Sequence, residues 1–263
     1  MPIASGSPIN AQKDKMGALF TCSIDDGHPS DMRMAELLSK HGLKGTFFVP
    51  IKNREGPDVL LPAQIREIGR EFEIGSHTYD HCYLNSIDGT EASYQVAEGK
   101  QRLEDILGDE VNGFCYPGGK YLQKHVALIQ SAGFRYARTI KNFRFDAGSN
   151  PYEIPTTIQF YPHSRSVYLR NFVSGGDWPA RLSGLRVTLR QENWMDRLYA
   201  LFDHARQYQS LFHLWCHTND IDNLSAWNEM EQFLAYAAAR VTVPNRLENR
   251  QVAERFFPEE KGK

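Results

Sequence analysis

Gly17-Ala18-Leu19-Phe20-Thr21-Cys22-Ser23-Ile24, an apolar run that ends at Asp25-Asp26-Gly27, decides the fold of this chain. The run contains β-forming residues and predicts a buried strand. Residues 32–41 have helical spacing, and residues 45–49 predict a second strand that Pro50 stops. A strand, a helix and a strand within about thirty residues form a βαβ unit, which implies a parallel sheet.

The same alternation continues along the chain. Only residues 140–190 interrupt it, with prolines, aromatic residues and arginines but no clear periodicity, and a long segment of this kind is more often functional than spare. About seven βα units in one domain predict a closed or nearly closed β/α barrel, with an open sheet as the alternative. Further strands are predicted at 73–75, 112–116, 134–138, 211–216 and 241–243, and helices at 62–70, 91–107, 121–132, 194–209 and 226–240.

Composition narrows the class of protein. The chain has 263 residues, 41% hydrophobic, which suits one large domain over 16–263 after a polar arm at 1–15. A net charge of −2 gives no electrostatic reason to expect nucleic acid, and no apolar run is long enough to span a membrane. Cysteines 22, 82, 115 and 216 have no paired short spacing and predict free thiols. With no visible secretory signal, the expected location is the cytoplasm.

Residues that carry chemistry follow four of the predicted strands. They are Asp25 and Asp26, the segment His77-Thr78-Tyr79-Asp80-His81, the turn Pro117-Gly118-Gly119, and His217. Active residues of β/α barrels lie at the carboxyl ends of the strands, so these four segments are expected to meet at one rim.

These residue types permit metal-assisted hydrolysis. One carboxylate and two histidines leave positions open on a divalent ion, and histidines four apart can share one face of a helical turn. The second carboxylate can take a proton from water, a glycine-rich turn can hold an oxyanion, and His217 can protonate a leaving amine. The ligand set alone also allows a two-histidine, one-carboxylate iron oxygenase.

The motifs resemble those of polysaccharide deacetylases of the NodB-homology type, carbohydrate esterase family 4. The Thr-Phe-Asp-Asp-Gly motif of that family corresponds to Ser23-Ile24-Asp25-Asp26-Gly27, and His-Ser/Thr-x-x-His is intact at 77–81. Cys115-Tyr116-Pro117-Gly118-Gly119 resembles a relaxed third motif, and Leu214-Trp215-Cys216-His217 resembles the late Leu-x-His motif. The motifs stand in the order of the family between residues 18 and 220.

The resemblance implies a distorted (β/α)7 barrel and metal-dependent N-deacetylation of an amino sugar or polysaccharide. Asp25 would be the general base and His217 the general acid, while Asp26, His77 and His81 would bind the metal. Zinc is expected first, with cobalt, nickel, iron and manganese as alternatives. Residues Tyr116, Pro117, Gly118 and Gly119 would line the substrate groove, with the Gly118 N–H as oxyanion donor.

Two positions depart from the pattern of the family. The third motif often carries an arginine that pairs with the base, but Cys115 stands in that place, so Arg138 or Arg170 is expected to take it over. The Asp-Trp motif that tunes the acid histidine has one match here, Asp177-Trp178, which we assign to substrate binding.

Other histidines and aromatic residues compete for a role. His213 lies inside an apolar run and is expected to be a hydrogen-bonded core histidine, whereas His217 stands at the strand end. His163 is a candidate for substrate contact, with an exposed loop position as the alternative. Phe160, Tyr161 and Trp178 can stack on a sugar or pack in the core.

Three alternatives to polymer deacetylation remain at this point. The same site can act on a small cytoplasmic amide or on a carrier-linked sugar, and the segment 140–190 would decide which. The absent arginine also allows a sugar-binding protein without activity, and the iron enzyme is the third alternative. The expected partner is an N-acylated amino sugar or polysaccharide, not nucleic acid or a membrane, and a homo-oligomer is left open.

Overall fold

The structure, a computed structural model, describes residues 17–258, so the predicted arm at 1–15 lies outside the described residues. All strand pairs in it are parallel, and the neighbours follow the order β5-β4-β3-β2-β1-β7-β6. The eighth strand, β8, pairs with the first half of β1, where β2 does not reach. The strands are β1 Leu19–Asp25, β2 Thr46–Val49, β3 Glu73–Ser76, β4 Gly113–Cys115, β5 Tyr136–Arg138, β6 Ile158–Gln159, β7 Leu211–His217 and β8 Arg246–Leu247.

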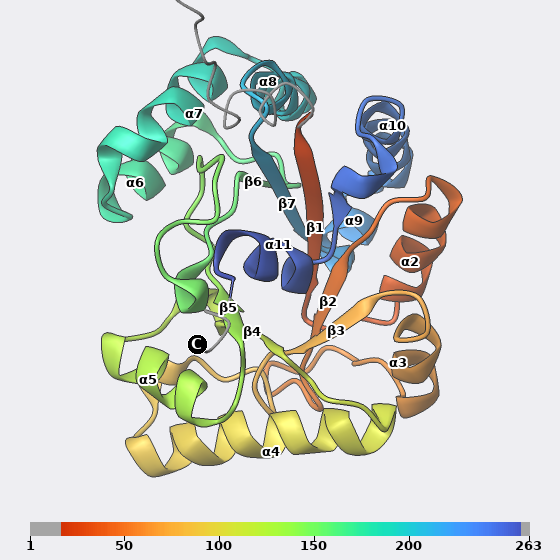
Figure 1. The fold of residues 1–263 in the computed structure, drawn as a ribbon, viewed down its shortest axis with the longest axis vertical. Helices are drawn as coiled ribbons and strands as arrows, with labels where there is room; N and C mark the ends of the chain where they lie inside the picture. Colours follow the sequence, from red (N-terminus) through yellow and green to blue (C-terminus); the bar gives the residue numbers. More distant parts are fainter. Residues whose placement is uncertain (1–16, 259–263) are drawn as a thin grey trace, which may run out of the picture.

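Helices surround this sheet, as a barrel with parallel strands requires. Figure 1 shows α4 along one side, α2 and α3 on the next, α6, α7 and α8 gathered at the other end, and α11 across the middle of the ring. The helices are α2 Asp31–Lys40, α3 Pro62–Ile68, α4 Gly89–Leu107, α5 Gln123–Ser131, α6 Arg165–Ser174, α7 Trp178–Arg190, α8 Trp194–Gln207, α9 Thr218–Leu224, α10 Trp227–Ala238 and α11 Asn249–Phe256.

The curled sheet closes through the segment that leads into β6. The Ile154 N–H donates to Ala137 O of β5 at 2.9 Å, and the Thr157 N–H donates to His213 O of β7 at 2.9 Å. One short segment thereby joins the two ends of the strand order. The distorted β/α barrel expected from the sequence is confirmed.

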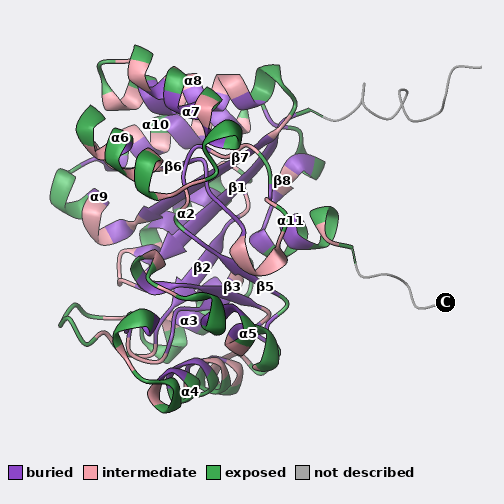
Figure 2. Cartoon of the chain, turned by 90° about the vertical axis from the view of Figure 1, so that its left-hand side faces the viewer, coloured by how far each residue is buried: buried purple, intermediate pink, exposed green. Residues whose placement is uncertain are grey.

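Strand β1 is buried along its whole length, yet its two faces differ. Phe20, Cys22 and Ile24 belong to the apolar layer between the sheet and the helices. Thr21 and Ser23 point the other way, into the barrel, where both hydrogen-bond Asn249 of α11. The interior therefore holds polar groups beside two small apolar clusters, while the largest hydrophobic cluster lies outside the ring, between the buried strands and the helices whose outer faces are exposed in Figure 2.

Two predictions about elements were wrong. Residues 241–243 form no strand, because Pro244 lacks the N–H that a ladder needs, and β8 begins only at Arg246. Residues 140–190 contain α6 and α7, which the pattern missed. Tyr168 is the one buried residue of α6, so this helix carries no apolar stripe to detect.

Candidate active site

The four segments predicted to converge do meet at the carboxyl ends of the strands. Asp25 and His217 are register partners on the neighbouring strands β1 and β7, so both side chains lie at one level of the barrel. Cys115 and Arg138 are register partners on β4 and β5 in the same way. Strand register thus brings residues separated by up to 192 positions into one layer.

Asp26, His77 and His81 form a cluster above this layer. Asp26 Oδ1 lies 3.4 Å from His77 Nε2 and 3.1 Å from His81 Nε2, and the two imidazole rings are 5.1 Å apart. Both histidines are buried, and Asp26 is about a quarter exposed. The three residues predicted to share a metal are therefore close enough to do so.

The side chains of His77 and His81 converge because of a backbone conformation that the sequence did not predict. The segment 77–81 is not a helical turn, because Thr78 and His81 have left-handed backbones with φ of 65° and 61°. Gly99 of α4 packs against this turn: a Cβ at Gly99 would lie 2.8 Å from the Thr78 carbonyl carbon. Side chains hold the turn as well, since Arg54 makes two hydrogen bonds to the Asp80 carboxylate, at 3.0 and 2.8 Å.

The cluster fits a divalent metal ion. Asp26 Oδ1 is buried, and it has no hydrogen-bond partner among the described residues. The Nδ1 of His77 lies 2.8 Å from Cys115 O, so its proton is directed to that carbonyl and the Nε2 lone pair faces Asp26. Burial alone would raise the pKa of Asp26, but the close imidazoles of His77 and His81 hold it well below its usual range. The cluster thus brings a carboxylate oxygen and two imidazole nitrogens together at one point.

A second grouping, Asp25, His77 and Cys115, is also compact enough to hold a metal. Burial raises the pKa of the Cys115 thiol well above its usual value, which keeps it protonated. The Asp25 carboxylate also accepts a hydrogen bond from Arg138. We therefore assign the metal position to Asp26, His77 and His81.

Arg138 is the partner of Asp25. Its guanidinium is fully buried and donates from Nη2 to Asp25 Oδ1, while the Cys115 thiol lies 3.8 Å from Oδ2. The rings of Phe48 and Trp215 flank this cation, each 5.3 Å from the guanidinium carbon. Arg170, the other candidate, is exposed on α6. Of the two arginines expected to replace the one absent at Cys115, Arg138 is therefore the one that contacts Asp25, and it is the register partner of Cys115 on the next strand.

His217 is held by a carboxylate that the sequence reasoning missed. Its Nδ1 lies 2.9 Å from Asp220 Oδ2 and 3.4 Å from the amide nitrogen of Gln159, and its Nε2 lies 3.7 Å from Asp26 Oδ2. Burial lowers the pKa of His217, but the Asp220 hydrogen bond and the charges of Asp26 and Asp25 outweigh it, and the pKa rises to about 9. The available signal was a carboxylate three residues after the histidine, in the first turn of α9.

Asp177-Trp178, the sequence match to the motif that tunes the acid histidine, contacts other residues than His217. Asp177 forms an ion pair with Arg144, and Trp178 is 55% exposed and donates its indole N–H to Val173 O. Both residues sit where α7 begins, so they leave the orientation of His217 to Asp220.

His163 and His213 have different surroundings. His163 Nε2 lies 2.8 Å from Gln159 Oε1, and Gln159 in turn contacts His217, so one side chain connects His163 with His217. His213 is the core histidine that the sequence predicted: it is buried between Ser23 Oγ at 2.7 Å and Pro155 O at 3.0 Å. Burial lowers the pKa of His213 to about 3, so it stays neutral.

The third-motif turn presents its backbone to the site, but not its tyrosine. Tyr116 is fully buried, stacks on Tyr121 at 4.0 Å and donates to Tyr152 O, so its side chain does not line a groove as predicted. Pro117 is also buried, and Gly118 and Gly119 follow with left-handed φ of 57° and 63°. The bonds within the turn run from Gly119 N–H to Tyr116 O and from Lys120 N–H to Pro117 O, which leaves the Gly118 N–H available.

Tyr83 completes this side of the site and was not predicted. A Cβ at Gly118 would meet its ring at 3.0 Å, and the ring lies 6.1 Å from that of His81. Tyr83 is 36% exposed, so one edge of the ring is free to contact a substrate.

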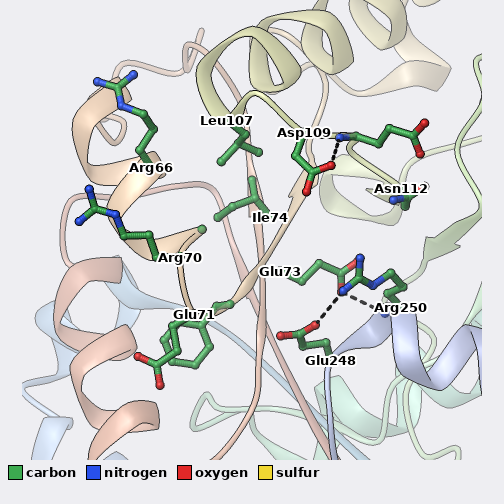
Figure 3. A pocket seen from close by; sticks show the side chains of 13 residues that line it. Arg66, Arg70, Glu71, Glu73, Ile74, Leu107, Asp109, Asn112, Glu248 and Arg250 are labelled. Atoms are coloured by element: carbon green, nitrogen blue, oxygen red, sulfur yellow. Dashed lines mark hydrogen bonds and ion pairs between the residues drawn. The ribbon is translucent and has the colours of Figure 1, made fainter.

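A cavity of about 450 Å³ lies at the opposite end of the barrel, where β3 begins (Figure 3). Three arginines and five carboxyl groups line it, and Figure 3 shows Arg250 between Glu73 and Glu248. Positive and negative groups are thus interleaved here, away from the residues with catalytic chemistry. None of the described helices combines the length and apolar character that crossing a membrane requires.

Comparison with known proteins finds similar sequences among the deacetylases. The sequence model of the polysaccharide deacetylase family matches residues 12–137, just under half of the chain. A chitooligosaccharide deacetylase of Azorhizobium caulinodans is 31% identical over 117 residues, which are 43% of this chain and 54% of that protein. A chitin deacetylase of Pestalotiopsis sp is 30% identical over 90 residues, 34% of this chain and 30% of that protein. The chain spans about half the length of the curated relatives it matches.

Solved structures extend the likeness of fold to the second half of the chain. A Mycobacterium smegmatis protein assigned to the polysaccharide deacetylases matches 97% of this chain and 94% of its own, with a TM-score of 0.60 and 16% identity. The Puue allantoinase matches 93% of this chain and 91% of its own, with a TM-score of 0.63 and 14% identity. In its barrel, its ordered motifs and the family model that matches its first half, this chain is similar to polysaccharide deacetylases of the NodB-homology type.

Proposed function

We propose that this protein is a metal-dependent hydrolase that removes an N-acetyl or similar acyl group from an amino sugar. One observation carries the proposal: Asp25 and His217 are register partners that flank the Asp26–His77–His81 cluster. A base and an acid on two sides of a metal position is what amide hydrolysis needs, because one group must take a proton from water and another must protonate the leaving amine.

Asp26, His77 and His81 would hold the divalent ion, for which zinc is the first choice because it suits one carboxylate and two imidazoles with positions left open. When bound there, such an ion supplies Lewis acidity that lowers the pKa of water and polarises the acyl carbonyl. Two histidines and one carboxylate also suit iron. We favour hydrolysis, because Asp25 and His217 would have no evident task in an oxygenase.

The remaining steps belong to side chains of this chain. Asp25 accepts a proton from the attacking water, and Arg138 fixes the carboxylate that does so. The Gly118 N–H donates to the oxyanion that develops on the acyl carbon. His217, oriented through Nδ1 by Asp220, donates the proton at Nε2 to the amine nitrogen as the C–N bond breaks. Its raised pKa keeps that proton in place at neutral pH, although a cation on Asp26 would offset part of the rise.

The substrate class rests on the relatives. The Azorhizobium protein is named for chitooligosaccharides and the Pestalotiopsis protein for chitin, and we extend N-acetylated amino sugars to this chain from them. We also propose a cytoplasmic location, with which four buried free cysteines are compatible.

The test is acetate release from N-acetylglucosamine, its oligomers and N-acetylated sugar phosphates, with Zn²⁺ or Co²⁺ and then with a chelator. We expect activity that the chelator abolishes, that added metal restores, and that Asp25→Asn lowers by about 10²–10⁴-fold. Activity that is indifferent to both chelator and Asp25→Asn would overturn the proposal. Release of acetate from no substrate under any metal would overturn it too.

A further inference from the structure

A cationic pocket of about 370 Å³ lies beside the third-motif turn. It is bounded by the turn 118–121, the segment 139–142 that follows β5, and helices α6 and α7. Its charged lining residues are Lys120, Lys141 and Arg181, and no carboxylate lines it. Thr139, Asn142 and Ser174 add polar groups that can hydrogen-bond a ligand. This volume falls at the lower end of small-molecule pockets, about 300–1,000 Å³.

The pocket adjoins the candidate active site. Thr139, in its wall, directly follows Arg138, the partner of Asp25. Gly118 lies in the wall as well and offers the backbone N–H assigned to the oxyanion. A substrate whose acyl group meets Gly118 can therefore extend into this pocket.

Arg181 places a buried positive charge in the wall of the pocket. Only 1% of this residue is exposed, and its five N–H groups all donate to oxygens of neutral groups, four backbone carbonyls and the Asn142 side chain. Burial and the neighbouring Arg144 lower the pKa of Arg181 to about 10, so it remains charged at neutral pH. Its hydrogen bonds are satisfied, but its charge is not neutralised by a contacting carboxylate.

Lys120 and Lys141 add two further positive charges to the pocket. Among residues 17–258, neither Lys120 nor Lys141 has a carboxylate within ion-pair distance. The cavity at the other end of the barrel differs, because carboxyl groups stand beside its arginines (Figure 3). Three cations around one pocket raise the local concentration of anions and favour groups with several oxygen acceptors.

We propose that this pocket binds an oxyanion, a carboxylate or a phosphate, carried by the substrate, so that the enzyme prefers anionic N-acylated amino sugars to neutral ones. The preference rests on the proposed deacetylase function, whereas the binding of the anion does not. Lys120 and Lys141 supply point charges at the mouth, and Arg181 supplies a fixed charge at the wall.

Binding is tested apart from turnover, with the full chain in EDTA so that no metal attracts the ligand. Calorimetric titration compares glucose 6-phosphate, glucuronate and glucose. We expect at least one anion to bind at least tenfold more tightly than glucose, and the one that binds distinguishes phosphate from carboxylate. Lys120→Met and Lys141→Met should each weaken it severalfold, while Lys124→Met should not. Lys124 has the same charge and lies exposed on nearby α5 without lining the pocket.

Equal affinity for all three sugars would overturn the proposal, as would unchanged anion affinity in both lysine variants. A second measurement compares kcat/KM for N-acetylglucosamine 6-phosphate, N-acetylmuramic acid and N-acetylglucosamine. We expect an anionic substrate to be preferred at least tenfold, and Lys120→Met to reduce that preference through KM. Anion binding without hydrolysis of any substrate would overturn the deacetylase function alone. Hydrolysis of neutral sugars without anion binding would overturn the anion site alone.

Discussion

The Arg138 guanidinium donates to the Asp25 carboxylate across 113 positions of sequence, with both groups buried in the barrel. Removing one member of such a pair leaves the other charge uncompensated. We expect Arg138→Met to lower the free energy of unfolding by about 3–5 kcal/mol. The double variant Arg138→Met/Asp25→Asn should recover much of this loss, because neither charge then remains. Urea unfolding of the two single variants and the double variant measures the coupling. Additive losses would contradict the pairing.

Substitutions of Cys115 and Arg138 can be compared for their effect on activity, because both side chains contact Asp25. If Arg138 has taken over from the position of Cys115, Cys115→Ser should retain activity within about threefold, because the thiol lies 3.8 Å from Asp25 and makes only a weak contact. Arg138→Lys should lose much more, because an ammonium cannot reproduce the planar guanidinium between two rings. Initial rates on one substrate decide this. A larger loss from Cys115→Ser than from Arg138→Lys would reverse the assignment.

Metal binding should appear as thermal stabilisation. A ligand that binds only the folded state at 100 times its Kd adds about 2.7 kcal/mol, so Zn²⁺ should raise the Tm of the natural chain. Asp26→Asn should abolish most of this rise, and asparagine tolerates the left-handed backbone of residue 26, whose φ is 78°. Asp25→Asn should keep the rise while losing activity. Differential scanning calorimetry with and without EDTA separates the two aspartates, and an equal loss of the Zn²⁺ effect in both would contradict their separate roles.

The turn that carries the histidines depends on a glycine in a distant helix. Gly99→Ala places a methyl group 2.8–2.9 Å from backbone atoms of Thr78 and Tyr79, so the turn must shift. We expect weaker Zn²⁺ binding and at least tenfold lower activity. Gly89→Ala, in the same helix with open space around it, should be neutral or stabilising. Isothermal titration with Zn²⁺ compares the pair, and equal affinities in both variants would show that Gly99 does not support the site.

Asp220 should act on catalysis through His217. Asp220→Asn keeps a side chain of the same size but removes the charge that orients the imidazole. We expect a fall in kcat with little change in KM, smaller than the loss of about 10²–10⁴-fold expected for His217→Ala. Asp177→Asn should leave kcat unchanged, because Asp177 pairs with Arg144 elsewhere. A stronger effect of Asp177→Asn than of Asp220→Asn would restore the assignment made from sequence.

Glu73, which lines the cavity at the end of the barrel opposite the candidate active site (Figure 3), predicts a pH dependence of stability. Burial raises its pKa from 4.5 to about 7, against hydrogen bonds from the Arg250 N–H, Thr46 and Tyr136 that lower it, and the nearby Glu248 carboxylate raises it further. The folded state therefore binds more protons than the unfolded state between these values, so stability falls as the pH rises from 4.5 to 7 and is constant above. This fall in the free energy of unfolding is on the order of 3 kcal/mol.

Glu73→Gln removes this titration. The difference in free energy of unfolding between Glu73→Gln and the natural chain should grow in favour of the variant from pH 5 to pH 7.5. Glu71→Gln, at an exposed neighbouring position, should show no such trend. Urea titrations at four pH values provide the comparison, and parallel pH profiles for Glu73→Gln and the natural chain would contradict the raised pKa.

Sequence reasoning found the residues whose chemistry is local in the chain. Asp25 and His217 end strands β1 and β7, Asp26 and His77 come directly after β1 and β3, and His81 lies four residues further on. The order of these residues in the sequence is what resembles the family. The barrel was also predictable, because alternating strands and helices leave few parallel topologies.

Contacts between distant segments could not be predicted in this way. Choosing Arg138 over Arg170 required the register of β4 against β5. The burial of Tyr116 depends on its stack with Tyr121, and the left-handed backbone of Thr78 depends on packing against Gly99. Asp220 was overlooked because an aspartate in the first turn of a helix is common for reasons of the helix dipole alone.

The two faces of β1 restrict how the sequence of this strand can diverge. Odd-numbered residues from Thr21 to Asp25 face the barrel interior, and even-numbered residues from Phe20 to Ile24 face the helices. Deleting one residue from this strand would exchange the two sets, putting the proposed general base, Asp25, among apolar helix side chains and isoleucine beside Arg138. The alternation of side chains along this seven-residue strand thus sets both the packing of the core and the position of the site residues. Strand β1 is therefore expected to diverge by substitution and not by insertion or deletion.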